Sequence, residues 1–151
     1  MSGEINLKIF MLGDSNAGKT QFIYKYVDEN FRDSCISTIG IEFKTKIIQI
    51  NDIYINLLIT DTIGQEKFRF FIKNCLKNAD GVILFYDITN INSFYIIEAF
   101  YFEIEENYSK DDIKCIVVGN NLDLEDEREV PREMVNSFCE RYNLEEIEVS
   151  S

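Results

Sequence analysis

Residues 13–20, which read GDSNAGKT, constrain this chain more than any other segment because they match the phosphate-binding pattern G-x-x-x-x-G-K-[ST]. Residues 5–12, which precede them, alternate and then become continuously apolar, as a buried strand does, and apolar residues at helical spacing follow over 21–27. A strand, a glycine loop and a helix N-terminus together aim backbone N–H groups and the positive end of a helix dipole at a phosphate. Lys19 can then reach the β- and γ-phosphates of a nucleotide, and the Thr20 hydroxyl can bind Mg²⁺. The segment therefore predicts a nucleotide-phosphate site made by Asp14, Ser15, Asn16, Ala17, Gly18, Lys19, Thr20 and Gln21.

The order of the expected elements predicts a mainly parallel α/β sheet. We expect strands over 5–12, 41–50, 53–61, 81–86, 113–119 and 147–150, and helices over 21–27, 66–77, 93–108 and 131–142. The segment 28–40 is expected to be a loop, and Asn51-Asp52 is a hairpin signal between two β-rich stretches. Alternating strands and helices indicate six strands, one antiparallel edge strand and helices on both faces. In such sheets, ligands lie beyond the carboxyl ends of the strands.

Composition limits the kinds of protein this chain can be. Its 151 residues are 46% hydrophobic and contain no linker, repeat or low-complexity block, so residues 1–151 are expected to form one domain. The net charge of −12 argues against nucleic acid and anionic lipid as direct partners, and the runs 125–127 and 145–146 are interpreted as solvated acidic faces. Four widely spaced cysteines and no histidine argue against zinc and against Ser-His or Cys-His catalysis. The sequence has no apolar run of roughly 20 residues and no signal-peptide or myristoylation pattern, so we expect a cytosolic protein with no membrane anchor in this chain.

A second group of candidate residues follows the expected strand 53–61. Asp61 at the end of that strand can hold Mg²⁺ through water, beside Thr20. Gly64 can offer its backbone N–H to a γ-phosphate, and Gln65 can orient an attacking water. The pattern D-x-x-G is weak alone, but its position some forty residues after a phosphate loop makes it specific.

A third group, Asn120-Asn121-Leu122-Asp123, follows the expected strand 113–119. The Asp123 carboxylate can accept hydrogen bonds from N1–H and the exocyclic amine of guanine, donors that adenine does not present in that arrangement. The alternative is a turn-forming asparagine with a solvated aspartate. Ser150 and Ser151 at the end of the chain can bring a backbone N–H towards the guanine oxygen.

Taken together, these motifs resemble the Ras superfamily of small GTPases, and most closely its Rab branch. The resemblance covers about residues 6–151 and rests on GDSNAGKT, STIGIEF over 37–43, DTIGQEKFR over 61–69, ILFYDIT over 83–89, GNNLDL over 119–124 and EVSS over 148–151. It implies the G-domain fold of P-loop NTPases, GTP or GDP with Mg²⁺ as ligands, and a switch governed by the γ-phosphate. It also implies that Thr38 binds Mg²⁺ only when GTP is present, that Phe31 packs on the guanine base, and that 39–43 belong to an effector surface. An exchange factor, a GTPase-activating protein and effectors at the two switch loops are the partners implied, and vesicle traffic is the process.

The chain departs from the family pattern at several positions. Ile63 replaces the usual Ala before the switch II glycine, and its branched side chain restricts the backbone there, so we expect slower hydrolysis or an altered GTP/GDP preference. Asn121 replaces a Lys that lies along the base, which predicts weaker nucleotide binding, and Cys35 replaces the switch I Tyr. Phe43 is retained from the aromatic triad that effectors read. Thr60 and Cys75 replace the other two members, so partner choice should differ from that of ordinary Rabs.

The sequence stops within the S-A-K-like motif, so the family's last helix is not expected in this chain; a shortened piece and a protein without a lipid anchor both fit. The apolar surface that this helix would cover is expected to favour self-association or a partner. Lys19 and Gln65 are the expected catalytic residues of a GTPase with slow intrinsic turnover. The alternative is a guanine-nucleotide-binding module with little hydrolysis. A kinase is disfavoured because the sequence has no arginine-rich lid.

Overall fold

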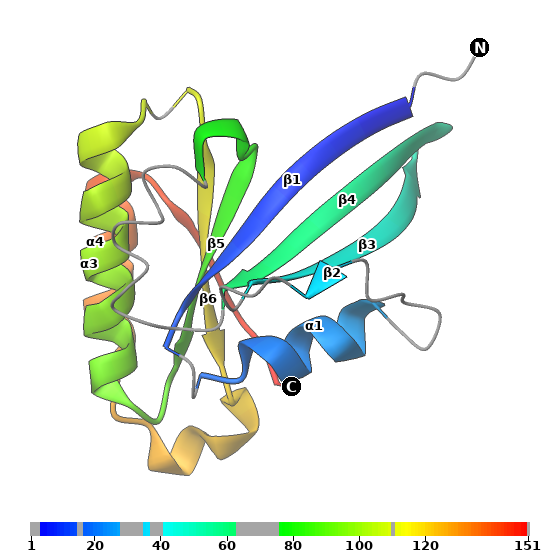
Figure 1. Ribbon diagram of the computed structural model, residues 1–151. Helices are drawn as coiled ribbons and strands as arrows, with labels where there is room; N and C mark the ends of the chain where they lie inside the picture. The colour runs from blue at the N-terminus through cyan, green and yellow to red at the C-terminus, as the bar shows by residue number, and fades with distance from the viewer. Residues whose placement is uncertain are drawn as a thin grey trace.

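One twisted sheet carries the site and the helices around it (Figure 1). The computed structural model describes residues 4–14, 17–27, 35–36, 41–62, 76–109 and 111–150. Its strands are β1 (Glu4–Gly13), β2 (Cys35–Ile36), β3 (Ile41–Ile50), β4 (Ile53–Thr62), β5 (Gly81–Asp87), β6 (Lys114–Asn120) and β7 (Glu145–Glu148). Its helices are α1 (Lys19–Val27), α3 (Ile91–Asn107) and α4 (Arg132–Tyr142), with 3₁₀ turns η1 (Leu76–Asn78) and η2 (Leu122–Glu127).

The order of strands across the sheet is β2-β3-β4-β1-β5-β6-β7. Of the six strands expected from the sequence, β3 alone runs antiparallel to its long neighbour, which confirms the mostly parallel sheet. The expected loop over 28–40 is wrong at Cys35–Ile36, which form the short strand β2 against Phe43 and Glu42 of β3. Two residues are too few to show a strand period in the sequence. The edge of the sheet is therefore β2 over this short stretch.

The β3–β4 hairpin is built by its turn residues. Asn51 and Asp52 have φ values of 49° and 65°, and Ile50 pairs with Ile53 across them. Two consecutive residues with positive φ define the two-residue turn whose twist matches that of the flanking strands, and Asn and Asp tolerate this backbone best. The hairpin signal at these two residues is confirmed.

The helices cover the two faces of the sheet unequally. α3 and α4 pack on one face, where Phe138 lies with its ring centroid 5.7 Å from that of Phe94 and 5.6 Å from that of Tyr101. α1 packs on the other face, where Phe22 lies 5.3 Å from Phe85 between ring centroids. Of the expected helix 66–77, the structure describes only the end, as the turn η1. Helices on both faces are confirmed.

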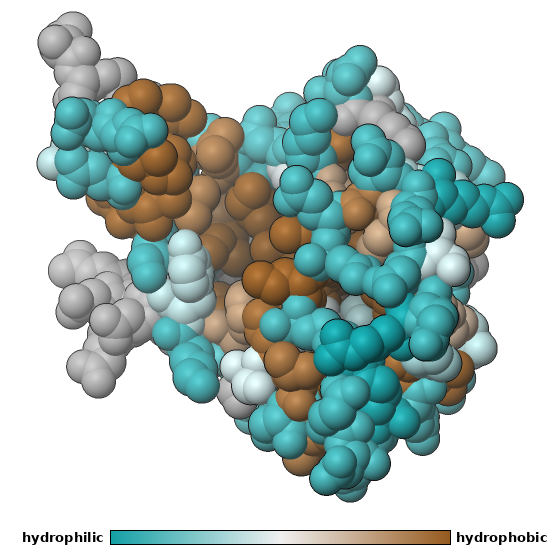
Figure 2. All heavy atoms as spheres, turned by 180° about the vertical axis from the view of Figure 1, so that it is seen from behind, coloured by the Kyte–Doolittle hydropathy of each residue, from teal (hydrophilic) through white to brown (hydrophobic). Residues whose placement is uncertain are grey.

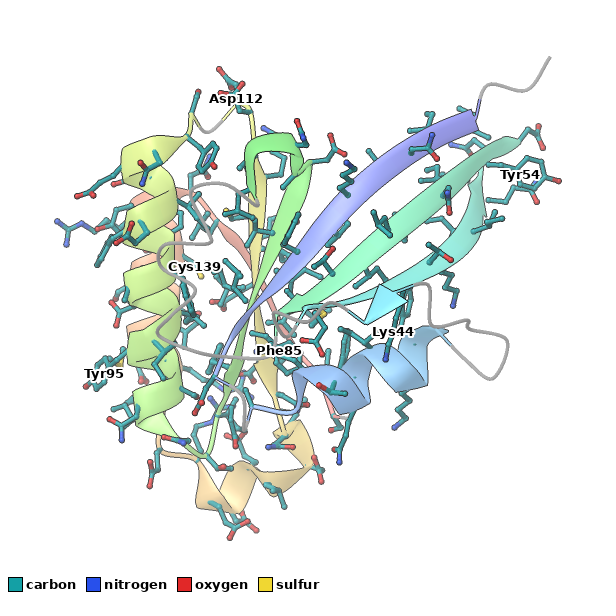
Figure 3. All side chains as sticks on the ribbon, in the orientation of Figure 1. Lys44, Tyr54, Phe85, Tyr95, Asp112 and Cys139 are labelled. Carbon is teal, nitrogen blue, oxygen red and sulfur yellow. The ribbon has the colours of Figure 1, made fainter. Side chains whose placement is uncertain are left out.

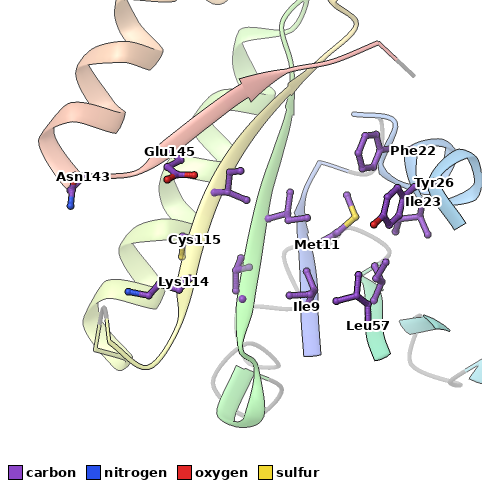
Figure 4. A pocket seen from close by; sticks show the side chains of 15 residues that line it. Ile9, Met11, Phe22, Ile23, Tyr26, Leu57, Lys114, Cys115, Asn143 and Glu145 are labelled. Atoms are coloured by element: carbon purple, nitrogen blue, oxygen red, sulfur yellow. The ribbon is translucent and has the colours of Figure 1, made fainter. Parts of the chain in front are cut away.

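On the α1 side, a groove of about 740 Å³ lies between α1 and the β6–β7 edge (Figure 4). Its lining is mostly apolar and includes Ile9, Met11, Phe22, Ile23, Leu57 and Ile116, with Lys114 and Glu145 near its rim. Figure 2 shows this face, with apolar side chains gathered in a hollow. Within the described ranges, no helix combines the length and the apolar character needed to cross a bilayer.

Candidate functional site

The candidate site lies where β1, β4 and β6 end and α1 begins. Gly13 closes β1 against β5, because a Cβ at this position would lie 2.1 Å from the carbonyl oxygen of Phe85. Gly18 has a φ of 91°, a backbone conformation that disfavours any side chain, and α1 starts at the next residue. The two glycines therefore allow a tight loop that leads from the strand end into the helix N-terminus.

Lys19 is the buried cation of this loop. Its side chain is 2% exposed, and its Nζ donates a hydrogen bond to the Gly13 carbonyl oxygen at 2.7 Å. Burial lowers the pKa of this ammonium from its ordinary value, although the nearby carboxylates of Asp61 and Asp14 act in the opposite direction. The ammonium is held inside the loop, where an added phosphate would further favour its charged form.

Thr20 and Asp61 form the second part of the site. The Thr20 hydroxyl donates to Oδ2 of Asp61 at 2.7 Å, which joins the start of α1 to the end of β4. Asp61 is 1% exposed, and its Oδ1 has no hydrogen-bond partner among the described residues. A buried carboxylate oxygen beside a hydroxyl is the kind of hard oxygen donor set that Mg²⁺ binds. These two side chains therefore fit the expected metal.

Asn120 connects the phosphate loop to the segment after β6. Its Nδ2 donates to the Ala17 carbonyl oxygen at 2.9 Å, across 103 residues of sequence, and its side chain is buried. Its Oδ1 has no partner in the part of the chain that the structure describes. The side chain thus fixes two loops relative to each other and keeps one acceptor available.

The end of the chain lies against the segment after β6. Leu122 N–H donates to the Val149 carbonyl at 3.0 Å, and Val149 N–H donates to the Gly119 carbonyl at 2.8 Å. Asp123 N–H donates to the Ser150 hydroxyl at 3.1 Å, while the Asp123 side chain is exposed. The structure therefore brings the expected base-reading residues of these two segments side by side.

Asn121 adopts the left-handed conformation, with φ 71° and ψ 36°, at the start of η2. Asparagine reaches this region at low cost, whereas most residues with a Cβ are strained there. Asn121, which replaces the Lys of the family pattern, is thus well suited to the backbone conformation of this loop.

An ion-pair network beside these loops was missed by sequence reasoning. The Arg128 guanidinium donates to Glu125 at 2.7 and 2.9 Å and to Glu148 at 2.8 and 2.9 Å. The prediction of a solvated acidic face over 125–127 is confirmed by the exposure of all three side chains, and the hydrogen bond from Arg128 lowers the pKa of Glu125. An arginine three residues after a glutamate was the available signal.

Several expected site residues lie outside the described residues: Ser15, Asn16, Phe31, Thr38, Gly64, Gln65 and Ser151, together with Ile63 and Cys75 among the departures. Gln21 is described and is exposed on α1, next to Thr20. Thr60 is buried near the C-terminal end of β4, between Phe10 and Phe43 in the strand pairing, so this position presents no aromatic surface.

Comparison with known proteins gives one consistent result. The sequence profile of the Ras family matches residues 8–151. Human Ras-related protein Rab-3A is 40% identical over 144 residues, which cover 95% of this chain and 65% of Rab-3A. Human Rab-3D is 39% identical, with 95% of this chain and 65% of its own length covered. Bovine Rab-3C is also 39% identical, with coverage of 95% and 63%. The chain therefore spans slightly less than two thirds of the length of these relatives.

Proposed function

Since this chain belongs to the Ras family and is Rab-like, we propose that it is a guanine-nucleotide switch that binds GTP or GDP with Mg²⁺ and hydrolyses GTP. The observation that carries the proposal is the cluster of Lys19, Thr20 and Asp61 at the ends of β1 and β4. A buried ammonium, and a buried carboxylate oxygen that has no hydrogen-bond partner among the described residues, suit a nucleotide phosphate and its metal.

The reaction is GTP plus water giving GDP and phosphate. Lys19 stabilises the negative charge that builds up on the β- and γ-phosphate oxygens, and the backbone N–H of Gly64 binds the γ-phosphate. Gln65 orients the water that attacks the γ-phosphorus; these roles of Gly64 and Gln65 rest on the family resemblance. Thr20, Thr38 and Asp61 are the residues we propose to hold Mg²⁺, Asp61 through water. When bound, the metal neutralises charge on the β- and γ-phosphates.

Guanine recognition is assigned to the segments that follow β6 and β7. The Asp123 carboxylate accepts from N1–H and the exocyclic amine, and the backbone N–H groups of Ser150 and Ser151 approach the guanine oxygen. The bond from Asn120 to the Ala17 carbonyl supports this assignment, because it ties the base loop to the phosphate loop. Asn121 takes the place along the base that the family gives to Lys, and Phe31 packs on the base.

The rival proposal is a binding module that retains GTP with little hydrolysis. Ile63, Asn121 and Cys35 favour it, since each changes a position that the family uses to order the nucleotide. Thr20 and Asp61 favour hydrolysis, since their contact keeps two of the metal-holding groups together. We therefore place an active GTPase first.

Partners follow from the same family. We propose an exchange factor, a GTPase-activating protein and effectors that bind the two switch loops, in the cytosol and in vesicle traffic. Thr60, buried where an aromatic effector contact is usual, supports a choice of effectors different from that of ordinary Rabs.

We propose self-association through the apolar groove on the α1 side. Each copy carries a net charge of −12, so association should strengthen as salt screens the repulsion. Light scattering over a concentration series tests this. Ile116→Glu places a charge in the groove and should abolish association, whereas Ile47→Glu, on an exposed part of β3, should not. Equal dimer content in both variants would contradict the assignment.

The proposed nucleotide site is tested by titrating fluorescent GDP with and without Mg²⁺. We expect tight binding that chelation weakens, competition by GTP, and no competition by ATP. Thr20→Ala should remove most of the Mg²⁺ dependence, while the matched control Thr45→Ala, on the exposed side of β3, should keep it. Absence of GDP binding by the unmodified protein would refute the proposed function.

A further inference from the structure

Arg128 joins two segments that face the candidate base site. Its Nη2 lies 2.8 and 2.9 Å from the two carboxylate oxygens of Glu148, at the end of β7. Its Nε and Nη2 also donate to Glu125 within η2, and its Nη1 donates to the Val130 carbonyl at 3.0 Å. One side chain thus bonds to the element after Asn121 and to the element before Val149.

The backbone around Arg128 is itself anchored. Glu129 N–H and Val130 N–H donate to the Ile88 carbonyl at 2.8 and 3.0 Å, and the side chains of Ile88 and Val130 are fully buried. Arg128 therefore projects from a fixed point of the core towards Glu148. Charge-assisted hydrogen bonds of this kind are stronger than neutral ones and are directional.

The two arginines of the ion-pair network differ in the solvent exposure of their side chains. The side chains of Arg128 and Glu148 are 12% and 17% exposed, whereas Arg132, which lies 3.1 Å from the same glutamate, is 58% exposed. A shielded pair is weakened less by water and salt than an exposed one, so the contact from Arg128 should hold Glu148 more firmly than the contact from Arg132. Arg132 is therefore a natural control for Arg128.

Glu148 immediately precedes the residues that hold the base loop. Val149 accepts from Leu122 N–H and donates to the Gly119 carbonyl, and the Ser150 hydroxyl accepts from Asp123 N–H. If Glu148 moves, these bonds move with it, and the Asp123 carboxylate loses its fixed position relative to Ser150.

We propose that Arg128 is a positioning residue for guanine recognition, which holds Glu148 so that Asp123 and Ser150 keep the spacing needed to read the base. The inference rests on the proposed function. It assigns an effect on affinity and base selectivity to a side chain that is not among the candidate base-reading residues.

Release of fluorescent GDP tests the proposal in the full chain, with Arg128→Ala, Arg128→Lys, Glu148→Gln and Arg132→Ala compared. We expect GDP release to be faster by on the order of tenfold in Arg128→Ala and in Glu148→Gln, since each removes a charge-assisted contact. Arg128→Lys should fall between Arg128→Ala and the unmodified protein, because a single ammonium cannot reproduce the forked contacts. Arg132→Ala should release GDP at close to the unmodified rate.

Two further readouts separate positioning from general stability. The preference for GDP over inosine diphosphate, which lacks the exocyclic amine, should shrink in Arg128→Ala because Asp123 is less well placed. Hydrogen exchange at Leu122, Asp123 and Val149 should quicken in that variant without a matching change in α3. If Arg128→Ala does not fold, Glu148→Gln gives the same readouts.

The experiment distinguishes failure of the proposed function from failure of the positioning role of Arg128. An unmodified protein that binds neither GDP nor GTP would refute the proposed function. If the unmodified protein binds normally, and Glu148→Gln and Arg132→Ala have equal release rates and equal selectivity, the positioning role of Arg128 would be overturned. The proposed function would still stand.

Discussion

The buried bond between Asn120 and the Ala17 carbonyl gives the sharpest prediction about the site. Figure 3 shows the side chains on the ribbon and labels Phe85 of β5, the strand that pairs with β6. Asn120→Ala removes the donor and leaves a carbonyl oxygen with one partner fewer at Ala17, which is 1% exposed. Removal of one partner that leaves a buried polar group unsatisfied costs about 1–3 kcal/mol, so the variant should lose about 1–3 kcal/mol of unfolding free energy. For a chain of this size, each kcal/mol lowers Tm by roughly 2–4 °C, which predicts a fall of roughly 2–12 °C.

The assay is thermal unfolding followed by circular dichroism on nucleotide-free protein, with Asn136→Ala as the matched control. Asn136 is exposed on α4, so its removal should leave Tm nearly unchanged. The same Asn120→Ala variant should release GDP faster, because the phosphate loop and the base loop are no longer tied. Equal Tm values for the two variants would refute the reasoning, since the bond would then contribute nothing to stability.

Three further predictions use other parts of the site. Asn121→Lys should slow GDP release, while its nucleotide-free form loses ~1 kcal/mol from the left-handed backbone; unchanged release would contradict the role given to Asn121. Lys19→Met should abolish GDP binding yet raise the Tm of the nucleotide-free protein at neutral pH. Burial lowers the Lys19 pKa below its unfolded value, so the charged folded form carries a cost throughout the pH range below the folded pKa, and the cost disappears as pH rises towards 10.5. A Tm gain that does not shrink with rising pH would count against this account. Desolvation raises the pKa of Cys115 to about 11, so its alkylation, followed by mass spectrometry, should be slow at pH 8 and accelerate up to that value; fast reaction at pH 8 would show a more open groove.

The strands beside the site could be predicted because buried strands consist mainly of apolar residues. The continuous apolar run over 81–86 and the mostly apolar segment 113–119, both predicted as buried strands, correspond to β5 (Gly81–Asp87) and β6 (Lys114–Asn120). Each extends one residue further than expected, because the parallel ladder pairs Asp87 with Asn120. The predicted strands end just before Asp87 and Asn120, but strand pairing includes these polar residues, and Asn120 is itself buried.

The sequence predicts the bounds of β7 and α3 less accurately, because strand pairing and helix capping set them. β7 is Glu145–Glu148, two residues earlier than the expected 147–150, because Glu145 pairs with Ile116 although its side chain is exposed. α3 begins at Ile91, earlier than expected, because the Asn90 side chain accepts from Asn92 N–H and caps the helix. Apolar periodicity carries no information on either contact.

The contacts that organise the site depend on the folded geometry. Motif spacing was enough to nominate Lys19, Thr20 and Asp61, since each residue type has its own chemistry. It gave no reason to expect that Asn120 reaches Ala17 or that Arg128 reaches Glu148, because those pairs are separated by 103 and 20 residues and share no pattern. Such bonds are visible only once the strands are in register.

Single-turnover phosphate release from GTP-loaded protein tests the central claim most directly. The measurement compares the unmodified protein with Gln65→Leu, with and without Mg²⁺, and uses Gln49→Leu on exposed β3 as the control. We predict Mg²⁺-dependent release on the order of 10⁻⁴ to 10⁻³ per second, abolished by Gln65→Leu and unchanged by Gln49→Leu. Stoichiometric retention of GTP, alike in all three proteins, would contradict the GTPase and leave the binding module.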